Sequence, residues 1–588
     1  MAMFLRKKIV HKKDRSGDWR VKLLVGGFFF AFCIVMARLY FLQVSTFPFY
    51  EALAQDQHMA SSALVPRRGE IYMRNGSGED YPLAVNRKYA TVYVVPKEVE
   101  DVSATVNFLS EYLEKDKEKL FSLFEDLEDP FEIVEKRVDE EKAQAIKEEK
   151  RKGVHVMPEM FRYYPGGELA GQVVGFVGSD GETWLGRYGI EASFESLLKG
   201  EGGIIRQERD AQGRWIAITE REFKPAMDGS DLVLTLDAGV QYEVERVLRE
   251  RVEKHDADGA SAIVLESGTG KILAMANIPT FDPNHYAQVE DMATFLNPSV
   301  SHVYESGSVF KPLTLAIGLD TGKIDPETTY VDTGVVVEAG YEIMNSDEKA
   351  YGTQTMTQVL EKSLNTGTIF VERQVGNELF AEYVQRFGFG KRTGIKLPSE
   401  SYGSLANLEY LTRDINFYTA SFGQGISMTL LQLALSYDVL ANGGLLMEPH
   451  IVDHVIGPDG ERKEYEKKSV RRVISDTTAR QVREMLYSVV ENGHGTQAQV
   501  PGYRVGGKTG TAQVASKDSR GYSEEESIGT FAGLAPVGDP KFIVVVKIRN
   551  PKDVIWAESS AAPAFGDIMR FLLDYYGVEP TEPINGME

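Results

Sequence analysis

A serine and a lysine three positions apart, Ser308 and Lys311, have the residue types and spacing for nucleophilic catalysis. They lie in an apolar run, Tyr304 to Asp320, whose pattern predicts a buried helix with Ser308 in its first turn. Positions three apart share a helix face, so the lysine amine would lie beside the serine hydroxyl. A lysine removed from water can take the proton of a serine hydroxyl. Because such pairs also occur by chance, their interpretation depends on the rest of the chain.

The start of this helix has its own signals. Ser306 and Gly307 are expected to form the cap. Pro312 falls near the first turn, where an amide N–H has no partner within the helix, so a proline is tolerated there. These residues favour a helix that begins just before Ser308.

Two further short motifs follow in order. Ser363-Leu364-Asn365 comes after a segment of helical character, and the run from Lys508 to Thr511, KTGT, lies on a predicted strand flanked by glycines. The set S-x-x-K, S-x-N and K-T-G is the signature of serine β-lactamases and penicillin-binding proteins. Three motifs in this order predict one catalytic cleft.

The residue types suggest a role for each member of the first two motifs. Ser308 would attack a peptide carbonyl and form an acyl-enzyme while Lys311 takes its proton. Ser363 can pass a proton to the leaving amine. Asn365 is suited to orient Lys311 and to hold an amide of the substrate. Backbone N–H groups at the helix start would face the developing oxyanion.

The third motif is suited to bind the substrate. Lys508 adds positive charge, and the hydroxyls of Thr509 and Thr511 can bind a terminal carboxylate. Gly510 leaves room for a substrate backbone to lie against the strand. The N–H of Thr511 is a second candidate donor to the oxyanion. We therefore expect a substrate peptide that ends in a free carboxylate.

Composition and charge exclude several classes of function. The 588-residue chain has a formal net charge of −22, which argues against nucleic acid as a partner because phosphate binding needs clustered Lys and Arg. The one cysteine, Cys33, lies in an apolar run, so the remainder has no disulfide and no thiol nucleophile. The nine histidines lack metal-binding spacing. We expect neither a metal nor a cofactor.

Basic charge gathers before an apolar run near the N-terminus. Between Met1 and Lys22 stand eight Lys or Arg against two Asp, and Leu23 to Leu42 is apolar except for Arg38. This run matches the roughly 20 residues of a bilayer-spanning helix. A cleaved signal peptide is the alternative, but Phe41 to Val44 offers no small-residue cleavage site. The positive-inside rule then predicts a cytoplasmic N-terminus and an extracytoplasmic remainder in the cell membrane.

Strand and helix patterns suggest two parts beyond the apolar run. The first part has strand patterns at 65–72 and 90–95 and amphipathic helix patterns within 104–152, where we interpret the charge run 135–152 as a solvated helix face. The second part has a mainly helical region at 300–490 and ends in a helix. Five strand patterns lie on either side of that region, at 260–266, 271–276, 503–514, 530–535 and 542–548. A further strand pattern lies at 232–236. An antiparallel sheet split by a helical insertion is the simplest arrangement.

With these motifs the chain resembles the class B penicillin-binding proteins, which are peptidoglycan D,D-transpeptidases. The resemblance extends from the apolar run to about Leu573. It also rests on segments outside the three motifs: PRRGEIYMRNG from Pro66, RYYPGGELAGQVVGFVG from Arg162, GRYGIEASFESLLKG from Gly186, GTGKILAMANIPTFDPN from Gly268, SFGQGISMTLLQLA from Ser421 and FAGLAPVGDPKFIVVV from Phe531.

The resemblance implies an α+β multidomain fold. Its expected parts are a basic cytoplasmic tail (1–20), a transmembrane anchor (21–42), an elongated α+β pedestal for dimerisation or partner binding (43–225), a serine β-lactamase-like transpeptidase domain (226–576) and a tail (577–588). In this family the pedestal contacts a SEDS-type glycosyltransferase. The serine is acylated by a D-Ala-D-Ala stem peptide, D-Ala leaves, and a neighbouring peptide's amine accepts the acyl group. β-Lactams mimic the donor.

Three departures from the family pattern stand out. Met73 replaces the usual acidic residue before Arg74, Ser306 replaces a common proline, and the run from Ala557 to Ser560 lacks the usual glycines. The last two can alter loop shape beside the site. His302 and His494, near the motifs, are expected to be structural or solvent-facing.

Two alternatives to a transpeptidase remain. One is a carboxypeptidase or β-lactamase-type hydrolase, which would need a base that activates water. The other is a non-catalytic membrane-anchored scaffold or β-lactam sensor, against which the complete set of motif residues argues. Within the transpeptidases, short insertions in the pedestal favour a division role over an elongation role.

Overall fold

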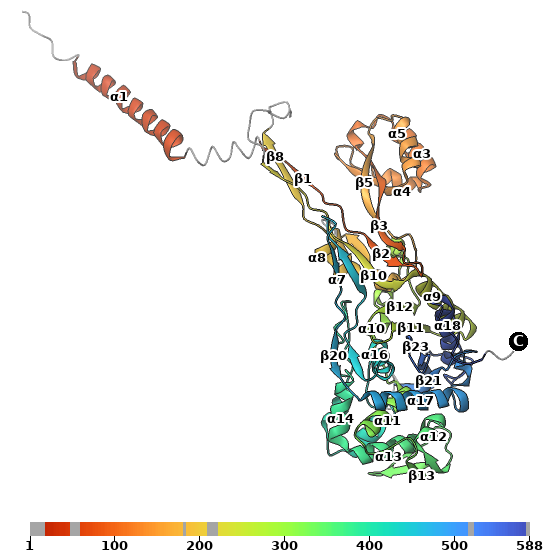
Figure 1. Cartoon of the computed structure of the whole chain (residues 1–588). Coiled ribbons are helices and arrows are strands. Elements are labelled where there is room, and N and C mark those ends of the chain that lie inside the picture. The colour runs from red at the N-terminus through yellow and green to blue at the C-terminus, as the bar shows by residue number, and fades with distance from the viewer. Residues whose placement is uncertain (1–17, 47–58, 180–183, 209–221, 516–521, 584–588) are drawn as a thin grey trace, which may run out of the picture. The chain divides into compact units, whose positions relative to one another are not determined.

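The computed structural model describes every residue except 1–17, 47–58, 180–183, 209–221, 516–521 and 584–588 (Figure 1). The chain separates into two compact units. The first consists of Met1–Pro66 and Glu201–Met227, and the second of Arg67–Gly200 and Asp228–Glu588.

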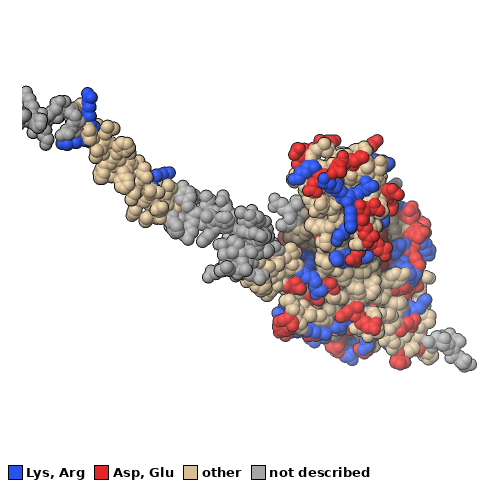
Figure 2. Space-filling view, turned by 90° about the horizontal axis from the view of Figure 1, so that it is seen from above, with Lys and Arg blue, Asp and Glu red and all other residues tan. Residues whose placement is uncertain are grey.

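The first unit contains a long apolar helix, α1 (Asp18–Tyr40), which continues into the short π-helix η1 (Phe41–Ser45). The apolar span runs over 26 residues, Trp19–Val44, and none of its most apolar window is buried. Figure 2 shows α1 mostly tan, with blue basic side chains near its ends. By length and composition this helix can cross a membrane, as the sequence predicted. The same unit holds the antiparallel sheet β1 (Met59–Leu64), β8 (Gly203–Glu208) and β9 (Glu222–Lys224).

One sheet of the second unit has seven strands drawn from distant parts of the chain. The strands on its main path follow the order β19 (Arg462–Glu464), β18 (Val452–Ile456), β10 (Asp231–Asp237), β2 (Ile71–Arg74), β3 (Asp80–Val94) and β4 (Glu132–Val138). The seventh, β5 (Val154–Tyr163), also pairs with β3. The predicted strand at 232–236 is thus confirmed as β10, and it pairs in parallel with β2.

A small core forms where three helices pack against β3, β4 and β5. The helices are α3 (Val102–Leu113), α4 (Lys117–Ser122) and α5 (Glu140–Glu148). Apolar residues such as Val92, Val106 and Ile146 are buried there. The interpretation of 135–152 as one helix face was wrong, since its first residues belong to β4 and only the next stretch forms α5.

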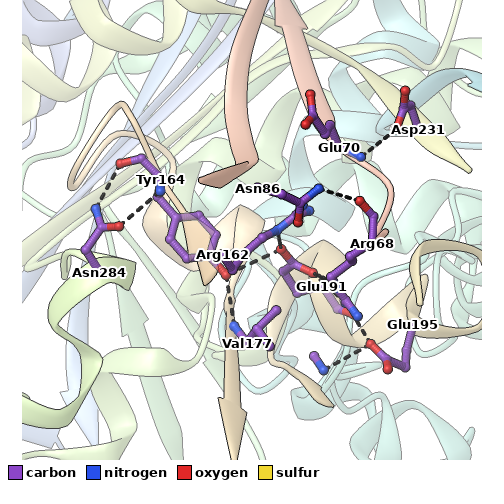
Figure 3. A network of polar contacts seen from close by, with 11 residues as sticks. Arg68, Glu70, Asn86, Arg162, Tyr164, Val177, Glu191, Glu195, Asp231 and Asn284 are labelled. Atoms are coloured by element: carbon purple, nitrogen blue, oxygen red, sulfur yellow. Dashed lines mark hydrogen bonds and ion pairs between the residues drawn. The ribbon is translucent and has the colours of Figure 1, made fainter. Parts of the chain in front are cut away.

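A buried ion-pair network joins three segments of the second unit (Figure 3). Glu191, on the short helix α7 (Gly189–Ser193), is completely buried. Its carboxylate accepts hydrogen bonds from Arg68 Nε at 2.8 Å and Arg162 Nε at 2.6 Å. Burial alone would raise the pKa of Glu191, but Arg162 and Arg68 hold it below its usual value. The segments around Arg162 and Glu191 therefore have a structural role.

The other large sheet has five antiparallel strands. Their order is β12 (Ile272–Ile278), β11 (Gly259–Glu266), β23 (Phe542–Arg549), β22 (Tyr522–Ala535) and β21 (Gly506–Ala515). Helices α9 (Ala238–Lys254) and α18 (Ala561–Tyr575) pack on one face, where Val264 and Val544 are buried with them. On the other face Ile263 and Val545 share a core with α16 (Leu430–Ala441) and α11 (Lys311–Asp320) (Figure 1).

The chain between β12 and β21 is mainly helix and loop, so the predicted antiparallel sheet with a helical insertion is confirmed. Its main helices besides α11 and α16 are α12 (Met356–Glu361), α13 (Asn365–Val375), α14 (Asn377–Arg386), α15 (Asp414–Ala420) and α17 (Asp476–Asn492). Small two-stranded sheets also occur there: β13 (Thr329–Asp332) with β16 (Gly352–Thr355), β14 (Val335–Glu338) with β15 (Tyr341–Met344), and β17 (Leu445–Met447) with β20 (Ser469–Arg472).

The remaining elements are short. They are η2 (Pro96–Glu98), α6 (Gly171–Val174), β6 (Phe176–Ser179), β7 (Trp184–Arg187), α8 (Glu195–Leu198), η3 (Pro283–Gln288), η4 (Met292–Phe295), α10 (Pro298–Ser301), η5 (Gly307–Phe310), η6 (Ala406–Glu409) and η7 (Thr496–Ala498).

Candidate active site

Ser308 lies in a 3-10 turn rather than in the first turn of the α-helix. That turn, η5, runs from Gly307 to Phe310, and α11 begins at Lys311. Gly307 has a φ of 61°, which favours glycine. Pro312 occupies the first turn of α11, as predicted. The expected side-chain cap is wrong, because the Ser306 hydroxyl caps nothing and is buried without a hydrogen-bond partner.

Lys311 is completely buried at the start of α11. Its amine donates to the carbonyl oxygen of Ser363 and lies 3.2 Å from the Ser363 hydroxyl. Burial, and then the positive charge of Lys508, lower the pKa of Lys311 well below its usual value. A buried amine with a lowered pKa is available as a base near neutral pH.

Ser363 lies in the connection between α12 and α13 with a φ of 56°, a left-handed conformation that is uncommon for residues other than glycine. Such backbone strain persists where the surroundings hold it, and here two lysine amines bind the residue. Lys508 Nζ donates to Ser363 Oγ at 3.1 Å, and the same oxygen lies 3.2 Å from Lys311 Nζ. The hydroxyl of Ser363 therefore connects the first and third motifs.

Lys508 is completely buried on β21, the edge strand of the five-stranded sheet. Besides Ser363, its amine donates to the Thr509 carbonyl oxygen at 3.0 Å. Burial lowers the pKa of Lys508 to about 7, while the negative charge of Glu558 acts in the opposite direction. Lys508 thus changes charge within the physiological pH range.

The next three residues of β21 run beside the turn that carries Ser308. A side-chain carbon on Gly510 would meet the Ser306 oxygen and the Val309 nitrogen at 2.9 Å, so only glycine fits this approach. Thr509 is 7% exposed. The Thr511 hydroxyl accepts a hydrogen bond from the Ala557 N–H at 3.1 Å. Ala557 belongs to the segment that departs from the family pattern.

Two expected contacts are not formed in the structure. Asn365 donates to the Met344 carbonyl oxygen at 2.8 Å, and no hydrogen bond between described residues joins it to Lys311. The residue that orients Lys311 is Ser363. The Ser308 hydroxyl also makes no hydrogen bond within the described part of the chain. In unliganded enzymes catalytic hydrogen bonds often tighten only when substrate binds.

Sequence reasoning missed a pair of side chains beside the third motif. His494 Nδ1 lies 3.1 Å from a carboxylate oxygen of Glu558. The hydrogen bond to His494 is the main cause of the lowered pKa of Glu558, and Lys508 contributes to it. His494 was expected to be structural or solvent-facing, and it is half exposed. The only indication of this pair in the sequence was the run from Ala557 to Ser560, which contains Glu558 and departs from the family pattern.

One cluster of possible metal ligands lies away from the three motifs. Ligand atoms of Asp453, His454 and Glu464 lie within 4.8 Å of one another. Lys271 Nζ, however, donates to the Asp453 carboxylate at 2.8 Å. A lysine ammonium in that place makes this an ion-pair cluster, and the prediction that the chain uses no metal stays a prediction.

Two family models match the chain. Residues 260–570 match the penicillin binding protein transpeptidase domain, and residues 63–234 match the penicillin-binding protein dimerisation domain. The ordered motifs and the ion-pair network lie within these two ranges.

Relatives and solved structures match over most of the chain. Stage V sporulation protein D of Bacillus subtilis (strain 168) is 36% identical over 555 residues, 93% of this chain and 84% of its own length. The probable peptidoglycan D,D-transpeptidase PenA of Neisseria gonorrhoeae is 31% identical over 581 residues, 97% and 95% of the two chains. Penicillin binding protein 3 of Mycobacterium tuberculosis, solved with aztreonam, is 28% identical with a TM-score of 0.68, covering 89% of this chain and 99% of its own.

Proposed function

The chain belongs to the class B penicillin-binding proteins and is a peptidoglycan D,D-transpeptidase, and from that premise we propose that Ser308 is its acyl-carrying nucleophile. The observation that carries this proposal is the meeting of three motifs at one point. Lys311 and Lys508 both bind Ser363, and β21 passes against the turn that holds Ser308. This arrangement of the three motifs is sufficient for acyl transfer through Ser308.

In the proposed first step, Ser308 Oγ attacks the carbonyl carbon of the penultimate D-Ala. Lys311 accepts the hydroxyl proton, because burial lowers the pKa of its amine and so favours the neutral form. Ser363, bound to both lysines, relays a proton to the leaving nitrogen, and D-Ala departs as a neutral amine. The acyl group is then bound to Ser308 as an ester.

In the second step the amine of a neighbouring stem peptide attacks that ester. The proton of the amine passes through Ser363 and Lys311 back to Ser308, which restores the enzyme. Lys508, Thr509 and Thr511 hold the carboxylate of the donor, and Gly510 admits its backbone. Asn365 is assigned to an amide of the substrate, although its Nδ2 donates to Met344 in the unliganded protein. β-Lactams acylate the same serine as mimics of the donor.

We further propose that α1 anchors the protein in the cell membrane with the N-terminus in the cytoplasm. Its length and composition, and the basic residues before it, support this topology. We also keep 1–20, 21–42, 43–225, 226–576 and 577–588 as the proposed parts of the chain, and the family matches over 63–234 and 260–570 support the third and the fourth. We assign the 43–225 part to a SEDS-family glycosyltransferase partner. A role in division or spore formation is supported by the names of similar proteins, stage V sporulation protein D and FtsI homolog.

The proposal is tested with a synthetic donor peptide ending in D-Ala-D-Ala, together with an acceptor peptide that has a free side-chain amine. The full-length protein should release D-Ala and form the cross-linked peptide. Ser308→Ala, Lys311→Met and Ser363→Ala should each reduce that product by at least about a hundredfold. Trimmed donor without cross-linked product would favour the hydrolase, and an unchanged donor would favour a scaffold or β-lactam sensor.

A further inference from the structure

A cationic cavity lies beside the five-stranded sheet, and its lining contains none of the residues of the three motifs. It has a volume of about 210 Å³. Its walls come from β11, β23 and the segment that leads into Ser308, and they include Ser261, His302, Tyr304, Lys547 and Arg549. Small-molecule pockets usually start near 300 Å³, so this one has the size for a small ion or one charged group.

Lys547 is a lysine of this wall whose side chain is largely buried. It is 7% exposed, and its ammonium lies over the ring of Tyr304, 4.8 Å from the centroid. It forms no hydrogen bond or ion pair with any residue that the structure describes. Burial, with the nearby charge of Arg549, lowers the pKa of Lys547 to about 8, so the amine is still mostly protonated at pH 7. An unpaired buried charge is costly unless something compensates it.

The other walls add the positive charge of Arg549 and one carboxylate, Asp291. Arg549 lies two positions along β23 on the same face as Lys547, and it donates to the backbone oxygen of Asp258 at 2.7 Å, while its charge also helps to lower the pKa of the Asp258 carboxyl group. Burial, Lys547 and Arg549 all lower the pKa of His302. Asp291 also lines the cavity, but its carboxylate accepts the Ala293 N–H and forms no ion pair among the described residues.

A hydroxyl donor completes the wall. Ser261 lies directly opposite Lys547 in the ladder between β11 and β23. It is 3% exposed, and its hydroxyl has no hydrogen-bond partner in the described parts of the protein. A buried ammonium, a guanidinium and a free hydroxyl around one small space match the needs of an oxyanion.

We propose that this cavity is a binding site for a small oxyanion, a carboxylate or phosphate group, held by Lys547, Arg549 and Ser261. The anion supplies the charge that Lys547 lacks. Because Tyr304 forms part of the wall and stands four residues before Ser308, a bound anion also stabilises the segment that carries the nucleophile. The site is separate from Lys508 and does not depend on the roles proposed for the three motifs.

The test is thermal unfolding of the full-length protein near pH 7 as inorganic phosphate or acetate replaces chloride at constant ionic strength. The wild type should show a saturable rise in Tm with at least one of the two anions, and the anion that acts identifies the group. Lys547→Met should weaken the binding derived from this rise by about tenfold or more. This variant removes an unpaired buried charge, so it should fold at least as well as the wild type without anion.

Two further variants serve as a control and as a second test of the site. Lys463→Met removes a positive charge from exposed β19 and should leave the anion response unchanged. Arg549→Gln removes the second, exposed cation of the cavity and should weaken binding even if Lys547→Met folded poorly. A wild type that saturates with neither anion would overturn the proposal. So would an equal response in Lys547→Met, Arg549→Gln and Lys463→Met.

Discussion

Lys508 Nζ lies 3.1 Å from Ser363 Oγ, and through that hydroxyl the KTGT strand reaches the buried amine of Lys311. The two lysines thus share one serine. Since the positive charge of Lys508 is a cause of the low pKa of Lys311, the third motif helps to set the strength of the base.

Lys508→Gln should move the pH dependence of acylation. Without the neighbouring positive charge, the pKa of Lys311 rises, so the rate that depends on neutral Lys311 reaches its plateau at a higher pH. Stopped-flow acylation by a chromogenic β-lactam over a pH series measures this shift. Lys508→Arg keeps the charge and should keep the rising limb near its wild-type position. An unmoved limb in Lys508→Gln would contradict the coupling.

Glu558→Gln should act on Lys508 in the opposite sense. The carboxylate of Glu558 raises the pKa of Lys508, so its removal leaves less protonated Lys508 at neutral pH and weakens the binding of the substrate carboxylate. The falling limb of the acylation profile should move to lower pH. Glu484→Gln, which removes an exposed carboxylate paired with Arg504, is the matched control and should leave the profile unchanged. Equal profiles for both variants would exclude this role.

Glu191→Gln should destabilise the fold strongly, because it leaves the buried Arg162 without its carboxylate and leaves Arg68 with Glu195 alone (Figure 3). The loss should be about 3–5 kcal/mol in the free energy of unfolding, measured with denaturant. Since the folded-state pKa of Glu191 is lowered, its contribution is present above the usual glutamate pKa and is lost as the pH falls. The difference between wild type and variant should therefore shrink in acid. Exposed Glu100→Gln should leave stability unchanged.

Ser306→Ala should stabilise the protein. The Ser306 hydroxyl is buried without a partner, so its removal relieves a desolvation cost of about 1 kcal/mol. Ser299→Ala is the matched control, because that buried hydroxyl donates to Asn277 Oδ1 at 2.8 Å and its loss should destabilise. Denaturant unfolding of both variants compares the two effects. Destabilisation of similar size in both would show that the Ser306 hydroxyl has a favourable contact.

The local patterns in the sequence predicted much of this fold. The hairpin of β11 and β12, the strands near the C-terminus and α18 follow from short apolar runs, and the KTGT motif lies on the predicted strand. Their meeting point followed from motif order and family resemblance. These features depend on residues close together in the chain.

What the sequence did not predict depends on contacts between distant residues. The parallel pairing of β10 with β2 brings together segments about 160 residues apart, and no local pattern encodes it. The pairing of His494 with Glu558 and the contact of Asn365 with Met344 are likewise set by tertiary packing. The 3-10 turn at Ser308 arises where Gly307 and β21 meet, so the apolar pattern alone predicted the wrong helix start.

The most direct test of the account is the mass of the full-length protein after reaction with a β-lactam. We expect one covalent adduct, located by peptide mapping on Ser308, with the mass of the intact antibiotic. Ser306→Ala, which changes a serine two positions earlier, should keep the adduct, and Ser308→Ala should abolish it. An adduct that persists in Ser308→Ala, or a folded wild type that forms none, would contradict the assignment of Ser308 as the acyl carrier.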